Sequence, residues 1–145
     1  MKNYLILTLV IIPIVFFSCR RKGCNDNNAL NYAGHFKKND GSCKYSGITF
    51  YALYNTYLGS PVTSIDINVD STYIGTINVG TTGNHPAGPS GCHDVNTVFY
   101  QIVNMSAITW YATIHFTGGG TATTSGSSGP NHFTECIKIN VTPTP

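Results

Sequence analysis

The chain has 145 residues, enough for one ordinary domain and a targeting segment. Charged residues make up 10%, whereas Gly, Thr, Ser, Asn and Tyr are abundant, a composition typical of β-strands and turns and unfavourable for helices. The formal net charge is +2, and half of the basic residues lie in the first 22 positions. The rest of the chain has no basic patch of the kind that nucleic acids require, so no nucleic-acid partner is expected.

Residues 1–18 have the three parts of a secretory signal peptide. A lysine stands near the start, Tyr4–Phe17 carries no charge, and the small Ser18 precedes Cys19. The uncharged run is too short to cross a bilayer comfortably as a helix. This pattern therefore predicts export of the chain.

Phe16-Phe17-Ser18-Cys19 resembles the lipobox of bacterial lipoproteins, with Phe16 at the position where Leu is commonest. The resemblance implies that Cys19 carries lipid, for example palmitate, and that Cys19 is the first residue of the mature chain. The protein would then be anchored in the cell envelope, at the outer membrane, facing the periplasm or the cell surface. A plain signal peptide or an uncleaved anchor is the alternative.

Residues 19–22 are predicted to form a tether, because Arg20-Arg21-Lys22 can lie against anionic lipid headgroups. The same charges also resemble the cytoplasmic flank of a membrane-spanning segment. That orientation would leave the remaining cysteines in a reducing compartment, where disulfides are rare. The tether is therefore the preferred interpretation.

The chain has five cysteines, an odd number for an exported protein. If Cys19 carries lipid, four remain, and they can pair in three ways. The segmentation of the chain favours the pairs Cys24–Cys43 and Cys92–Cys136, each within its own module.

Residues 23–45 are predicted to be a small module that needs a disulfide, because they are rich in Asn, Asp and Gly and poor in apolar side chains. The segment resembles a short repeat of secreted and lipid-anchored bacterial surface proteins, apart from Asn39, where Asp is usual. The matching residues are Cys24, Asp26, Ala29, Asn31, Tyr32, Asp40, Gly41, Ser42, Cys43 and Tyr45. The resemblance implies a location rather than an activity.

Asp26, Asn28 and Asp40 are weak candidates for calcium ligands, because Ca²⁺ binds carboxylate and amide oxygens. The segment lacks the alternating carboxylates and the closing Glu of an EF-hand loop. The favoured interpretation is that these side chains cap turns, and no metal or cofactor is predicted.

Residues 46–142 are predicted to form an all-β domain, with residues 143–145 as a frayed tail. Short apolar or alternating runs are separated by Gly, Pro, Ser and Asn, although Tyr51, Tyr54 and Leu58 could also form a helical stripe. The expected strands are Ile48–Tyr54, Ile65–Val69, Tyr73–Ile77, Val95–Val103, Ile108–Phe116, Thr121–Thr124 and Cys136–Val141. About seven strands at this spacing predict a small antiparallel β-sandwich, immunoglobulin-like or transthyretin-like.

Three segments loosely resemble a small sandwich of bacterial surface lipoproteins akin to carboxypeptidase-regulatory-like domains. These segments are Val69–Thr76, Ser90–Cys92 and Cys136–Ile139. Ser71 replaces the turn glycine of that pattern. The resemblance implies no catalytic site.

His85, Cys92, His93 and Asp94 are residue types that bind zinc. Adjacent strand residues point to opposite faces, however, and Cys136 is available as a disulfide partner for Cys92. No Gly-x-Ser-x-Gly motif is present, so the chain is not expected to be an enzyme.

The aromatic residues are the best candidates for ligand binding, because a small core cannot hide nine tyrosines and one tryptophan. Trp110 is expected in the core, since it alternates with Ile108 and Ala112. The tyrosines predicted to be partly exposed are Tyr51, Tyr57, Tyr73, Tyr100 and Tyr111.

The leading hypothesis is a lipid-anchored, non-enzymatic envelope protein that mediates adhesion or binds a glycan or another envelope protein. The alternatives are a structural spacer without a ligand and a small envelope hydrolase or metal-site protein.

Overall fold

The computed structural model describes residues 21–80, 83–102, 106–129 and 136–142. The signal peptide 1–18, Cys19 and the tail 143–145 lie outside these residues. In the described ranges, no helix is long and apolar enough to cross a membrane.

The chain divides into two compact units. Among the described residues, the first comprises 21–27 and Asn31–Cys43, and the second comprises Asn28–Leu30 and the described residues of 44–142. Asn28–Leu30 group with the second unit because the Leu30 amide donates to the Lys44 carbonyl at 2.7 Å.

The first unit is held together by a disulfide and a few backbone hydrogen bonds. Cys24 pairs with Cys43, the pairing favoured from the sequence. The Gly23 amide donates to the Lys38 carbonyl at 3.2 Å, beside a β-bridge between Lys22 and Lys38. Lys22, assigned above to the tether, is therefore already part of this folded unit.

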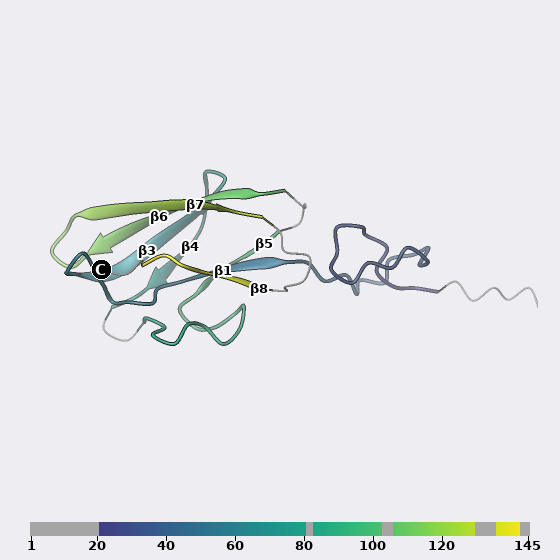
Figure 1. The fold of residues 1–145 in the computed structure, drawn as a ribbon, viewed down its shortest axis with the longest axis horizontal. Helices are drawn as coiled ribbons and strands as arrows, with labels where there is room; N and C mark the ends of the chain where they lie inside the picture. Colours follow the sequence, from purple (N-terminus) through teal and green to yellow (C-terminus); the bar gives the residue numbers. More distant parts are fainter. Residues whose placement is uncertain (1–20, 81–82, 103–105, 130–135, 143–145) are drawn as a thin grey trace, which may run out of the picture. The chain divides into compact units, whose positions relative to one another are not determined.

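In its described residues, the second unit is an all-β sandwich of two sheets and eight strands, whose arrangement Figure 1 shows. The strands are β1 Gly47–Tyr51, β2 Thr56–Tyr57, β3 Ser60–Val69, β4 Thr72–Asn78, β5 Val98–Gln101, β6 Ile108–Phe116, β7 Thr121–Ser128 and β8 Cys136–Asn140. The large sheet has the order β2-β3-β6-β7, with β4 also paired to β3, and the small sheet has the order β5-β1-β8.

The large sheet follows from strict alternation along β3 and β6. Ile65, Ile67 and Val69 are buried between the sheets, and the residues between them face outward. β3 and β4 form a hairpin whose turn residues, Asp70 and Ser71, have φ angles of 46° and 67°. Two consecutive positive φ angles are typical of a type I′ turn, which matches the twist of paired strands.

β6 brings Trp110 into the core, as predicted. The indole is 8% exposed and meets the Phe50 ring edge-on, with 5.6 Å between ring centroids. It also lies against Gly126 of β7, where an added Cβ would be 2.7 Å from the indole. A glycine at this position of β7 thus makes room for the largest side chain of the core.

The small sheet contains one parallel pair within the otherwise antiparallel sandwich. β1 pairs antiparallel with β5 and parallel with β8. Parallel neighbours need a long connection rather than a tight hairpin, and β1 and β8 are separated by most of the domain. Short apolar runs do not reveal strand direction, so the sequence did not distinguish this arrangement.

Strand limits differ in places from those expected. Residues 48–51 lie in β1 and not in a helical turn, and the short β2 was not anticipated. β3 begins at Ser60, five residues before the expected start at Ile65. The early start was not expected because the alternation of apolar and polar residues is less regular around Pro61. β7 extends beyond the expected Thr124 to Ser128. Its last residues were not expected in a strand because Ser and Gly are typical of turns.

Candidate functional site

The outward surface of the small sheet is covered by the loop of residues 83–97. The His85 amide donates to the Ala52 carbonyl, and the Thr49 hydroxyl donates to the Cys92 carbonyl, both at 2.7 Å. The Lys138 ammonium donates to the Pro89 carbonyl at 2.6 Å. β1 is therefore buried on both faces, and Thr49 is fully buried.

The same loop contains the residues considered as zinc ligands, and each already has another partner. Cys92 is in a disulfide with Cys136, as favoured from the sequence, and the His93 ring packs 4.1 Å from the Phe99 ring. The Asp94 carboxylate accepts hydrogen bonds from the amide and hydroxyl of Ser90. Those bonds, the amide first, hold the pKa of Asp94 below its ordinary value.

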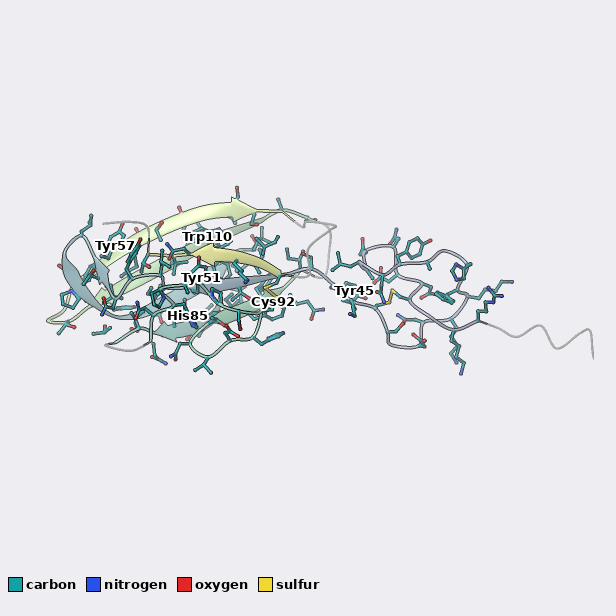
Figure 2. The ribbon with its side chains drawn as sticks, turned by 60° about the horizontal axis from the view of Figure 1, so that its bottom comes forward. Tyr45, Tyr51, Tyr57, His85, Cys92 and Trp110 are labelled. Carbon is teal, nitrogen blue, oxygen red and sulfur yellow. A yellow bond between two sulfur atoms is a disulfide. The ribbon has the colours of Figure 1, made fainter. Side chains whose placement is uncertain are left out.

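His85 lies 2.7 Å from the Val95 carbonyl through Nε2 and meets the Tyr51 ring edge-on (Figure 2). Throughout the described ranges, no three His, Cys, Asp or Glu side chains form a group that could hold a metal ion. The geometry of this loop is that of a cover over the small sheet.

The calcium candidates lie in the first unit and in the neighbouring Asn28–Leu30 segment. Asp40 accepts a hydrogen bond from the Ser42 amide, and Asn39 accepts one from the Gly41 amide. The contacts with Ser42 keep the pKa of Asp40 below its ordinary value. Both side chains cap turns, and within the described residues neither Asp26 nor Asp40 belongs to a group of three His, Cys, Asp or Glu side chains that could hold a metal ion.

The large sheet exposes its outward surface, here named the outer face. Its members lie in register on neighbouring strands: Ser64, Asp66 and Asn68 of β3, Tyr73, Thr76 and Asn78 of β4, Tyr111, Thr113 and His115 of β6, and Thr121, Thr123 and Ser125 of β7. Polar side chains fill this surface, and two tyrosines stand out from it.

Tyr73 and Tyr111 form one row of the outer face with Asn68 between them. Asn68 is the register partner of both tyrosines. The two residues are thus two strand spacings apart, about 9.5 Å at the usual spacing between strands. Tyr73 is 58% exposed and Tyr111 is 49% exposed. This register therefore places the two accessible tyrosine rings on one flat surface.

A hydrogen-bonded chain of side chains runs beside this row. Thr76 donates to one oxygen of Asp66 at 2.5 Å, and the other oxygen lies 2.9 Å from Nε2 of His115. The Tyr73 hydroxyl is 2.7 Å from the Thr76 hydroxyl. Because Thr76 gives its one hydroxyl proton to Asp66, Tyr73 must be the donor to Thr76.

Asp66 is the centre of this chain and keeps its charge. The hydrogen bond from Thr76 is the largest cause that lowers its pKa, followed by the contacts with His115, while partial burial acts in the opposite direction. Asp66 and His115 side chains are each 36% exposed, so the pair is open to solvent. The hydroxyl in the chain contacts the carboxylate and not the imidazole, unlike a nucleophile activated by histidine.

The five predicted tyrosines do not form one site. Tyr73 and Tyr111 share the outer face, but the other three contribute to packing. Tyr57 stacks on Phe116, with 6.3 Å between centroids, and Tyr100 packs against the core. Tyr51 is half-buried beside His85, and Tyr57 lies toward the other end of the sandwich from Cys92 (Figure 2).

Sequence reasoning did not single out Asp66, Thr76 or His115. The alternation along β3 and β6 already placed Asp66 and His115 on the polar faces of their strands. What the alternation lacked was the register between strands, which sets Thr76 opposite Asp66 and His115 diagonally beside it.

Comparison with protein-family models, curated proteins and solved structures finds no match to this chain.

Proposed function

We propose that this chain is a lipid-anchored cell-envelope protein whose β-sandwich binds glycan chains on its outer face. The observation that carries the proposal is the row in which the half-exposed Tyr73 and Tyr111 flank Asn68, beside the hydrogen-bonded Asp66 and His115.

The chemistry of the outer face suits a polyhydroxylated ligand. A sugar ring has an apolar C–H face, which packs on an aromatic ring, and hydroxyls, which need donors and acceptors around it. Tyr73 and Tyr111 supply the rings, Asn68 supplies an amide, and Asp66 supplies an acceptor that remains ionised. One paired carboxylate leaves little net charge on this surface, so an uncharged glycan is the expected ligand.

The cysteine pattern supports the anchor. The two disulfides occupy Cys24, Cys43, Cys92 and Cys136, which leaves Cys19 of the five cysteines outside them. Cys19 stands at the end of the uncharged segment, where the lipobox resemblance puts the modified residue. Disulfides also suit an exported location.

Glycan binding is tested with an array of neutral and acidic polysaccharides. We expect binding to a neutral glycan. Tyr73→Ala together with Tyr111→Ala should lower the affinity about tenfold or more, which corresponds to a loss of about 1.4 kcal/mol or more in binding free energy. Tyr32→Ala is the matched control, because Tyr32 is also 48% exposed but lies outside the outer face. A blank array, or equal loss with Tyr32→Ala, contradicts the proposal.

The anchor is tested separately with Cys19→Ala. We expect loss of the lipid mass from the N-terminal peptide and release of the protein from the membrane fraction. Wild-type fractionation of this variant contradicts the anchor without affecting the glycan proposal.

A further inference from the structure

β7 is an edge strand whose outward backbone groups can be assigned. The Phe116 amide donates to the Gly120 carbonyl at the start of the β6–β7 hairpin, so even-numbered residues of β7 turn their backbone groups toward β6. The amides and carbonyls of Thr121, Thr123, Ser125 and Ser127 therefore point away from the sheet. No strand in the described part of the chain pairs with this edge.

This edge lacks the features that usually prevent strand addition. Thr121–Ser128 is eight residues long and contains no charged residue and no proline. The opposite edge differs: β4 has a register shift beside Ile67 and Asn68, and its Gly75 packs against Val98 of β5.

We propose that β7 pairs antiparallel with β7 of a second copy of this chain. Two copies of an uncharged strand meet without charge repulsion, and their Thr and Ser side chains suit cross-strand hydrogen bonds. The outward groups all belong to odd-numbered residues. A two-fold axis can therefore set Thr123 of one copy opposite Ser125 of the other, and Thr121 opposite Ser127, with all outward donors and acceptors paired.

This pairing joins the outer faces of two copies into one continuous sheet surface. Odd-numbered residues of β7 also carry the exposed side chains of that strand, so the register keeps both outer faces on the same side. The proposal goes beyond ligand binding and does not depend on what the outer face binds.

The test is sedimentation velocity of the full chain in density-matched detergent over a range of concentrations, with hydrogen exchange at Thr123 and Ser125. We expect a dimer with protected amides at these two residues. Ser125→Lys places like charges across the two-fold axis and should weaken the dimer about tenfold or more. Thr113→Lys adds the same charge to the outer face on the central strand β6 and should leave the dimer intact.

Ser125→Pro provides a second variant, because it removes an outward donor and no hydrogen bond to β6. A monomer at all concentrations overturns the proposal, and a dimer that survives both Ser125 variants places the interface elsewhere. Protection of Thr123 and Ser125 in a monomer also overturns it, since a segment other than a second β7 would then occupy the edge.

Discussion

The two sheets of the sandwich differ in what lies on their outward surfaces. Residues 83–97 cover the small sheet, so that Thr49 is fully buried and its hydroxyl fixes the cover. Thr113 has the same side chain on the outer face of the large sheet, where it is partly exposed. The same residue type thus contributes to packing on one sheet and is available for binding on the other. Substitutions should therefore lower stability on the covered face and change binding on the open one.

The largest effect is expected from opening the covered face with Cys92→Ser and Cys136→Ser. The disulfide spans 44 residues, and losing it should lower the free energy of unfolding by about 4 kcal/mol. Urea unfolding measures the loss, and faster exchange of the His85 amide would show that the cover has loosened. Cys24→Ser with Cys43→Ser is the control and should leave the unfolding of the sandwich unchanged. Wild-type exchange at His85 would show that the cover does not depend on this disulfide.

A smaller effect is expected from Thr49→Val, which keeps the shape of the side chain but removes the hydrogen bond to the Cys92 carbonyl. Loss of a partner for a buried polar group should cost about 1–2 kcal/mol. Thr113→Val makes the same change on the open face and should stay within about 0.5 kcal/mol of the wild type. Equal losses for the two variants, measured by urea unfolding, would remove the distinction between the faces.

The smallest effect is expected from the Asp66–His115 pair on the open face. Because the native state lowers the pKa of Asp66 below its ordinary 3.8, its stabilising effect is present above that value and is lost as the pH falls through the native pKa. Solvent screens a pair this exposed, so Asp66→Asn should cost about 0.5 kcal/mol at pH 7.

The difference in stability between the wild type and Asp66→Asn should vanish as Asp66 becomes protonated below pH 3.8. Thr76→Val removes the largest cause of the lowered pKa and should reduce the same pH dependence. A difference that persists unchanged from neutral to acidic pH would assign the cost to a changed structure and not to charge.

Much of the fold could be predicted because the signals are local. Alternation along Ile65–Val69 and Ile108–Phe116 identified β3 and β6 with their buried faces. The two-residue β2 and the far end of β7 were missed. A two-residue strand has no period to detect, and the residues of β7 favour turns in isolation.

The candidate site could be predicted less well, because it depends on pairs of strands. All five expected tyrosines are at least partly exposed, but Tyr51, Tyr57 and Tyr100 also pack against neighbouring side chains. Exposure of a tyrosine depends on what covers its strand, and the loop over β1 lies more than thirty residues further along the chain.

The sequence by itself determined the all-β composition, the main strands and the buried face of each long strand, and it favoured one of three possible sets of cysteine pairs. The strands follow from a two-residue period, and the favoured pairs follow from the segmentation of the chain. Tertiary structure alone decided that β8 runs parallel to β1, that residues 83–97 cover one sheet, and that Thr76, Asp66 and His115 meet on the other. Register between strands is a non-local property, since a strand's pattern specifies which face is buried but not which residue lies opposite.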